Sequence, residues 1–269
     1  MFTRHKFTHL SFLKKMATFS NSVKIPKRFD TPLVPAPDER AGGVPPKGAG
    51  DARIPERIAL SGKSFLELHA DAVACDSVAF GALAAYLSEL PPTPNPMNAK
   101  TYLRRRQGTF GATYNFGSQT SQKMGGDDEA GWPDLVRRCL RDARSRVGEG
   151  ARLAVHANYY PDGAGVGVHY DKDGPFDHNK PILSYTFLSD PILPRDFDVY
   201  RGKASAKRKR DERAGAAYDK VLSLPLGHGS LLVMGGEMQS EFLHGVTPVS
   251  TRKFKNHVRI NLTIRHMKY

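Results

Sequence analysis

Residues 258–265, near the end of the chain, alternate apolar and polar side chains without a break. The apolar set is Val258, Ile260, Leu262 and Ile264, and the polar set is Arg259, Asn261, Thr263 and Arg265. Because strand side chains point alternately to two faces, this pattern predicts a β-strand with one polar face. The polar set spans about 20 Å at roughly 3.3 Å per residue, so its two arginines could bracket a short dicarboxylate. A half-exposed strand with its polar face in water fits the same pattern.

Other segments after Gly150 also have the texture of strands. They are short runs of β-branched, Leu and aromatic residues bounded by Gly, Pro and Asp: residues 151–160, 165–170, 181–188, 220–226, 229–234 and 257–266. Strands at this spacing, with no helices between them, favour an antiparallel sandwich or barrel. The basic interval from Arg201 to Arg213 interrupts the series and is predicted to be a long loop.

Two helical patterns come earlier in the chain. Apolar residues recur at helical spacing between Asp76 and Leu90, with Asp76 as the N-cap. A second helix opens at Pro133, and it has an apolar face that includes Cys139 and an opposite face rich in arginine. We therefore expect an α+β domain in which the helices come first and the β unit second.

Composition narrows the class of protein. The chain has 269 residues, enough for one large domain with a tail, and no apolar run approaches the roughly 18 residues of a membrane span. Its 40 Lys and Arg against 27 Asp and Glu give a net charge of +13, which favours polyanionic partners such as nucleic acid. The two cysteines, Cys75 and Cys139, exclude a disulfide framework and favour a reducing compartment.

The first 52 residues are predicted to be a disordered basic tail and linker, followed by the folded domain at residues 53–269. Residues 1–29 contain no acidic side chain, a composition typical of a mitochondrial or plastid transit peptide and equally of a plain basic tail. Residues 31–50 hold five Pro and four Gly, which is typical of a linker.

A possible metal site follows the strand at residues 151–160. Asn158 and Tyr160 share one face of that strand and could complete an anion site, or they could be surface residues beside a turn. His169 and Asp171 then form an H-x-D pair whose side chains share a face and could ligate one metal ion. His244 is the best candidate for a third ligand, with His228 and His178 as rivals. Two imidazoles and one carboxylate suit Fe(II), and Zn(II) is the alternative.

Taken in order, these motifs resemble the AlkB family of Fe(II)/2-oxoglutarate dioxygenases. The order is N-x-Y at residues 158–160, H-x-D at residues 169–171, G-S-L-L-V-M-G at residues 229–235, His244, and R-x-N-x-T-x-R at residues 259–265. The resemblance covers about residues 105–269 and implies a double-stranded β-helix, or jelly-roll, core. It also implies helices packed on one side of that core and an N-terminal nucleotide-recognition lid.

The same resemblance implies roles for individual residues. Iron would be held at the catalytic centre by His169, Asp171 and His244. The co-substrate 2-oxoglutarate, which reacts together with O₂, would be bound by Asn158, Tyr160, Arg259, Asn261, Thr263 and Arg265. In the family the two arginines pair with the carboxylates of 2-oxoglutarate, which matches the bracket expected from the strand pattern.

Upstream, a basic-Gln-aromatic-Gly run that contains Arg105 precedes Tyr114 and Phe116. This arrangement is similar to the lid with which the DNA-repair branch grips a flipped base, although core packing of the two rings is the alternative. The basic loop at residues 201–213 is similar to one that touches the second DNA strand, and it equally resembles a nuclear-localisation signal. Two positions depart from the family: Lys172 stands where many repair relatives carry an acid, and Met97 occupies the expected wedge.

The resemblance implies oxidative demethylation of alkylated bases in DNA, with release of formaldehyde, succinate and CO₂. Two alternatives are a demethylase of methylated RNA and a catalytically silent basic jelly roll that binds nucleic acid. We expect a monomer that acts on alkylated DNA or RNA and has no membrane as a partner. The expected location is the nucleus, or a mitochondrion or plastid if the basic tail is a transit peptide.

Overall fold

The computed structural model describes residues 56–95, 98–111, 122–123, 128–171, 176–202 and 218–268. Several predictions concern residues outside this described part: the tail and linker, Met97, Tyr114, Phe116, Lys172 and the basic segment from residue 203 onward. Within the described part, no helix is long and apolar enough to cross a membrane.

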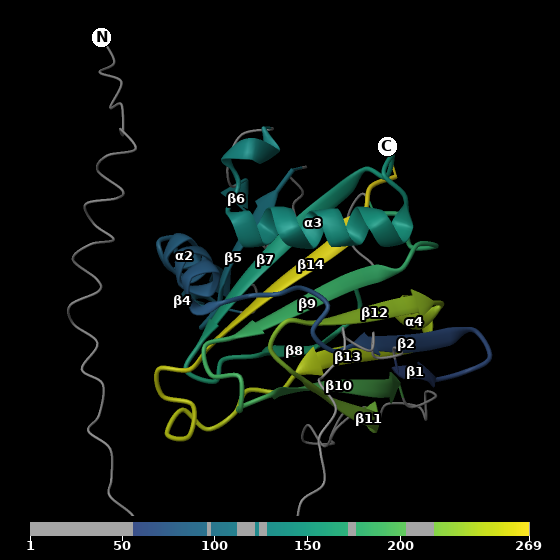
Figure 1. Ribbon diagram of the computed structural model, residues 1–269. Helices are drawn as coiled ribbons and strands as arrows, with labels where there is room; N and C mark the ends of the chain where they lie inside the picture. Colours follow the sequence, from purple (N-terminus) through teal and green to yellow (C-terminus); the bar gives the residue numbers. More distant parts are fainter. Residues whose placement is uncertain are drawn as a thin grey trace, which may run out of the picture. The chain divides into compact units, whose positions relative to one another are not determined.

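Eight strands form two facing sheets at the centre of the fold (Figure 1). Those in the larger sheet are β7 (Leu153–Pro161), β9 (Ile182–Leu188), β12 (Ser230–Gly236) and β14 (Val258–His266). Those in the smaller sheet are β8 (Val166–His169), β10 (Arg195–Gly202), β11 (Tyr218–Leu226) and β13 (Phe242–Val246). All six strands predicted from the sequence are present among these eight.

The path of the chain through the two sheets defines the architecture. The larger sheet has the order β1-β2-β12-β9-β14-β7-β5-β6, and the smaller sheet has the order β11-β10-β13-β8. From β7 to β14 the chain crosses between the sheets at every step except from β10 to β11, which pair directly. Antiparallel strands that wind between two sheets in this way form a jelly roll, so the predicted core is confirmed.

The N-terminal part of the described chain adds strands to the larger sheet. These are β1 (Glu56–Ala59), β2 (Ser64–His69), β5 (Arg106–Phe110) and β6 (Gln122–Lys123). A separate hairpin is formed by β3 (Pro94–Asn95) and β4 (Asn98–Tyr102). The expectation that helices precede the whole β unit was therefore wrong. In β5 the residues from Gln107 to Phe110 are all buried, so this strand shows no alternation that a sequence pattern could reveal.

Strand β10 was also hidden from the sequence pattern, because it carries charged residues. Arg201 belongs to this strand, so it is not part of a loop. Asp198 is buried in β10 and accepts hydrogen bonds from the hydroxyls of Ser223 and Thr247, each at 2.7 Å. The ammonium group of Lys220, a half-exposed side chain of the neighbouring strand β11, lies 2.8 Å from the same carboxylate, so the charge of Asp198 is paired.

Both predicted helices are present, α2 (Ser77–Ser88) and α3 (Asp134–Val147). Asp76 caps α2 by accepting a hydrogen bond from the backbone N–H of Ala79 at 2.8 Å. Cys139 lies on the buried face of α3, as expected. Within the described residues, the remaining helical segments are a 3₁₀ turn at Glu129–Gly131 and the short α4 (Met238–Glu241).

The two faces of the larger sheet have opposite character. Its outer face packs against α2 and α3 (Figure 1), and the apolar side chains of β14 lie in this core with Leu83 and Leu140. The inner face turns toward the smaller sheet. The polar set of β14 is on this inner face, with only 2–6% of each residue exposed, so the half-exposed alternative is wrong.

We expect Leu262→Ala to destabilise the fold by about 2–5 kcal/mol, because Leu262 is completely buried between β14 and the helices. Chemical denaturation would measure the change in the free energy of unfolding. Val78→Ala, on α2, is the control, since Val78 is 76% exposed and its truncation should cost less than about 0.5 kcal/mol. Equal effects of both variants would contradict the assignment of the two faces.

Candidate active site

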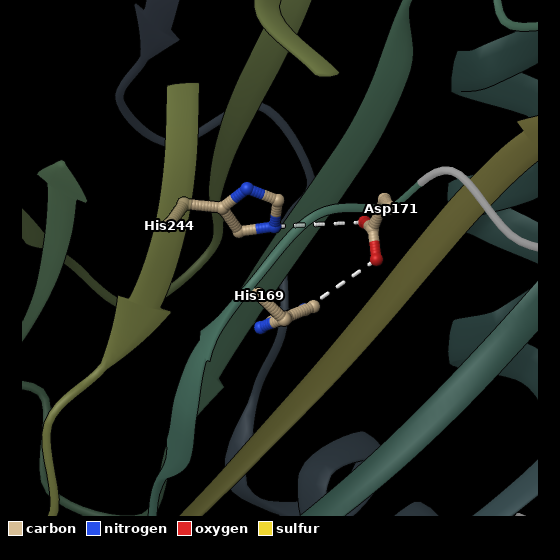
Figure 2. Close-up of side chains that lie close together, drawn as sticks. All are labelled: His169, Asp171 and His244. Carbon is tan, nitrogen blue, oxygen red and sulfur yellow. Dashed lines mark ion pairs between the residues drawn. The ribbon is translucent and has the colours of Figure 1, made fainter. Parts of the chain in front are cut away.

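Three potential metal ligands meet at the edge of the smaller sheet (Figure 2). His169 ends β8 and His244 lies in β13, and the antiparallel register of these strands places the two residues directly opposite each other. Their ring centroids are 4.6 Å apart. Asp171 follows β8 at the second position after His169, which returns its carboxylate to the same side.

The donor atoms of this group are close enough to bind one ion. Nε2 of His169 lies 3.4 Å from Oδ1 of Asp171, and Nε2 of His244 lies 3.6 Å from Oδ2. The ligand atoms of all three residues lie within 4.8 Å of one another. Nδ1 of His169 is 2.8 Å from the carbonyl oxygen of Gly167, so it donates its proton there and leaves Nε2 as the basic nitrogen.

The rival His228 has a structural role instead. Its Nε2 lies 2.8 Å from the carbonyl oxygen of Cys75, and its Nδ1 lies 2.8 Å from that of Leu188. Among the described residues, the grouping that could hold a metal includes His244 and neither His228 nor His178.

The Asp171 carboxylate is ionised although it is buried. Burial by itself would raise its pKa, but Arg265 lies 2.7 Å away and, with both histidines, holds the pKa well below its usual range. The Asp171 backbone N–H donates to Oε1 of Gln239 at 3.1 Å, which fixes the chain at this point. The site therefore presents a negatively charged ligand at neutral pH without first losing a proton.

The two histidines differ in their surroundings. His244 is buried and stacks on Phe197 at 5.3 Å, and this burial lowers its pKa. Burial also opposes protonation of His169, but the hydrogen bond to Asp171, the negative charge of Asp171 and the hydrogen bond to the Gly167 carbonyl together outweigh it and raise the pKa of His169. The His169 side chain is 38% exposed, against 5% for His244, so the site opens on the His169 side.

A cavity of about 420 Å³ lies beside these ligands, between the two sheets. Its lining includes every predicted 2-oxoglutarate residue: Asn158, Tyr160, Arg259, Asn261, Thr263 and Arg265. Arg105 also lines the cavity. The structure therefore brings together all of the predicted site residues except Tyr114 and Phe116, which lie outside the described residues.

A directional series of hydrogen bonds links polar residues that line the cavity. It starts at the carbonyl oxygen of Tyr185, which can only accept and receives the amide of Asn261 at 3.0 Å. This fixes the Asn261 Oδ1 as an acceptor, and it lies 2.9 Å from the Thr263 hydroxyl and 3.5 Å from the amide nitrogen of Asn158. The orientation of both asparagine amides therefore follows from one backbone group.

The series of hydrogen bonds continues to Gln107 and His156, two residues that were not predicted from the sequence to belong to the site. The Gln107 amide nitrogen donates to Oδ1 of Asn158 at 3.0 Å and lies 3.1 Å from Nε2 of His156. Since an amide NH₂ only donates, this Nε2 must accept, and His156 must be neutral with its proton on Nδ1. Burial, followed by Arg265 and Arg105, lowers the pKa of His156 to about 3, in agreement with this. The sequence could have indicated His156, because it lies two residues before Asn158 and therefore on the same face of the strand.

Arg259 is a buried cation without a counter-anion among the described residues. Only 2% of the residue is exposed, and its guanidinium donates a hydrogen bond to the Thr186 hydroxyl at 3.2 Å. Its guanidinium lies 5.1 Å from the centre of the Tyr160 ring, and burial lowers its pKa. A buried, unneutralised guanidinium is costly, so the cavity is suited to an anion at this point.

Residues 80–265 match the sequence model of the 2OG-Fe(II) oxygenase superfamily. The chain belongs to this superfamily. It is 33% identical over 165 residues to the human protein named DNA oxidative demethylase ALKBH2, and 31% identical to the mouse protein of that name. These matches cover 60% of this chain and 56% and 61% of the human and mouse proteins, so the chain spans little more than half the length of these relatives. The resemblance to the AlkB family is confirmed.

Two solved structures also align with the chain. One is OsALKBH1, at 16% identity and a TM-score of 0.44, covering 78% of this chain and 99% of that one. The other is a Pseudomonas putida prolyl-4-hydroxylase, at 17% identity and a TM-score of 0.42, covering 76% and 92%.

The residues present fit both groups that the superfamily implies. Two imidazole nitrogens and one carboxylate on one side of an ion form the arrangement typical of Fe(II) oxygenases, which leaves other positions open. The unneutralised guanidinium of Arg259 fits a carboxylate of 2-oxoglutarate.

We expect the affinity for a divalent metal to decrease as the pH is lowered through the region above the ordinary histidine value of 6.5, because the raised pKa of His169 makes a proton compete with the metal. Below that pKa the loss should approach roughly tenfold per pH unit. Titration with Co(II), followed by its visible absorption at about pH 6 and pH 8, would measure this. An affinity that did not change with pH would contradict the assignment of His169 as a ligand.

Proposed function

We propose that this chain is an Fe(II)/2-oxoglutarate-dependent dioxygenase that demethylates alkylated bases in DNA. The observation that carries the proposal is the His-Asp-His group beside a cavity whose buried Arg259 has no counter-anion among the described residues. Membership of the superfamily supports the reaction type, and the names of the human and mouse relatives support DNA as the substrate.

In this proposal His169, Asp171 and His244 are the iron ligands. When bound, the iron would supply, together with 2-oxoglutarate and O₂, the oxidation of an N-methyl group on the base. The methyl carbon would leave as formaldehyde, and 2-oxoglutarate would become succinate and CO₂. Asp171 is ready to bind the ion because Arg265 keeps it ionised. The Gly167 carbonyl holds His169 in the tautomer that has a basic Nε2.

The inner face of the larger sheet would bind 2-oxoglutarate. Arg265 lies next to the metal-ligand candidate Asp171, so it would pair with the carboxylate of the co-substrate on that side. Arg259 is six residues away on the same face of β14 and would pair with the opposite carboxylate. The hydrogen-bonded chain through Asn261 and Asn158 fixes amide groups between the two arginines, so little side-chain freedom is lost on binding.

The substrate base would enter on the exposed side of His169. Arg105 lines the cavity, and the lid with Tyr114 and Phe116 would grip the flipped base, as the family resemblance implies. The net charge of +13, with Lys207–Arg210 as its densest cluster, suits a polyanion.

Replacement of His169 or Asp171 by Ala should abolish formaldehyde release from a methylated oligonucleotide, because either change removes a ligand from the ion. The assay uses the full chain with Fe(II), 2-oxoglutarate and DNA or RNA of the same sequence. His228→Asn, outside the cavity, is the control and should retain activity if its Tm is preserved. Formaldehyde release from RNA but not from DNA would show that RNA is the substrate. Succinate formation without formaldehyde release from either nucleic acid would contradict both substrates.

Arg259→Gln should weaken 2-oxoglutarate use on the order of 100-fold in kcat/KM, because it leaves a buried carboxylate without its charged partner. Arg259→Lys should recover part of this loss, since it restores the charge without the planar fork. Steady-state kinetics with varied 2-oxoglutarate would measure both variants, with Tm values to confirm folding. A normal KM for 2-oxoglutarate in a folded Arg259→Gln protein would exclude this residue from the co-substrate site.

A further inference from the structure

The pairing of β8 with β13 holds two of the three candidate ligands but not the third. β8 ends at His169, where its partner in β13 is His244. Asp171 lies two residues beyond this end, so the strand pairing does not hold its backbone. Arg265 contacts the carboxylate of Asp171, at the tip of the side chain. The direction in which this side chain leaves the main chain therefore depends on another contact.

Gln239 makes that contact. The residue is 6% exposed, and its Oε1 accepts a hydrogen bond from the backbone N–H of Asp171 at 3.1 Å. Because a backbone N–H can only donate, the oxygen end of the amide must face Asp171. The nitrogen end lies 3.6 Å from the sulfur of Met234, which is a weak acceptor. The orientation of this buried amide is therefore set by its bond to Asp171.

Gln239 does not itself line the cavity. The described residues of the lining include Asp171 and His244 but not Gln239. Gln239 belongs to α4, which passes directly into β13: the backbone N–H of Phe242, the first residue of β13, donates to the carbonyl oxygen of Met238. His244 follows two residues later. One short segment therefore carries a histidine ligand and also holds the backbone of the carboxylate ligand.

Helix α4 is anchored on the turn between β1 and β2. The carboxylate of Glu241 accepts hydrogen bonds from the hydroxyls of Ser61 and Ser64. The backbone N–H of Glu237 donates to the carbonyl oxygen of Lys63 at 3.1 Å, and the side chains of these two residues form an ion pair at 3.1 Å. The position of α4 therefore depends on this turn.

We propose that Gln239 is a positioning residue of the metal site, and that the β1–β2 turn holds it in place through α4. The side chain of Gln239 holds the backbone of Asp171 so that the carboxylate faces both histidines. This inference rests on the proposed function, which assigns Asp171 as a metal ligand. The turn precedes residues 80–265, the region that matches the superfamily model, so a segment outside that region takes part in forming the site.

Gln239→Met tests the contact with a side chain of similar size that has no amide oxygen. Binding of Co(II), followed by its visible absorption at about pH 8, should weaken on the order of tenfold, because a ligand loses its support. Hydrogen exchange of the Asp171 amide in the metal-free protein, measured by NMR, should become about tenfold faster or more, because this amide loses its acceptor. Gln239→Glu keeps a side-chain oxygen and should recover most of both losses.

Ser240→Ala is the matched control, because Ser240 is the exposed next residue of the same helix. It should change neither the Co(II) affinity nor the exchange of the Asp171 amide. The KM for 2-oxoglutarate at saturating Fe(II) separates positioning from general damage to the site. In Gln239→Met this KM should change less than about threefold, since Gln239 does not line the cavity. If Gln239→Met does not fold, Gln239→Asn replaces it with the same expected losses, because its shorter side chain moves the oxygen away from Asp171.

Glu241→Ala tests the part of the turn, because it removes the acceptor of both serine hydroxyls. It should weaken Co(II) binding about threefold, and it should add no further loss to Gln239→Met, since both changes act through the same bond to Asp171. An unchanged Co(II) affinity in Glu241→Ala, or a loss that adds fully to that of Gln239→Met, would overturn the role of the turn.

The outcomes distinguish this inference from the proposed function. If the unchanged chain did not bind Co(II), the proposed function would fail, and the inference with it. If the unchanged chain bound Co(II) and a folded Gln239→Met protein bound it equally well, only the inference would be overturned. A loss of affinity that Gln239→Glu did not restore would also overturn it, because the oxygen of Gln239 would not be the cause.

Discussion

The inner face of the larger sheet is polar and buried, and this constraint governs the rest of the structure. Buried polar groups cost free energy unless each one has a partner. Most of these side chains satisfy one another: the amides of Asn158 and Asn261 are oriented from a single backbone carbonyl, and Arg265 neutralises Asp171. Arg259 is the exception, since its charge has no anion among the described residues. The unneutralised charge of Arg259 is therefore the point at which this face is suited to bind an anionic ligand.

The jelly roll makes this arrangement possible because the two faces of its larger sheet have different roles, one in stability and the other in forming the site. One face of the larger sheet packs on α2 and α3 and supplies the stabilising core, so the opposite face can carry polar groups. The smaller sheet covers that polar face and brings His169 and His244 opposite each other through the register of β8 and β13. His169 with Asp171, and His244 from a distant part of the sequence, can therefore meet beside the cavity.

The sequence predicted those parts of the fold whose patterns are local. The alternation in residues 258–265 predicted β14 and its polar face, and the spacing of His169 and Asp171 predicted their common side. Strands β5 and β10 were missed because β5 is buried on both faces and β10 carries the buried Asp198, whose charge Lys220 of the neighbouring strand pairs. In both cases the tertiary environment overrides the alternation on which a strand prediction depends.

The site could be predicted only up to the contacts between distant strands. Sequence spacing left His228 as a rival ligand, and only the pairing of β13 with β8 decided for His244. Gln107 and His156 were not assigned to the site because their link joins β5 to β7, which are far apart in the chain.

The central claim is that one metal ion and one dicarboxylate bind side by side in the cavity. Isothermal titration calorimetry of the full chain with 2-oxoglutarate under anaerobic conditions, with and without Fe(II), tests it most directly. The account predicts one 2-oxoglutarate per chain and tighter binding when Fe(II) is present, because the two ligands share a site. No binding, or an affinity that is the same with and without the metal, would contradict it.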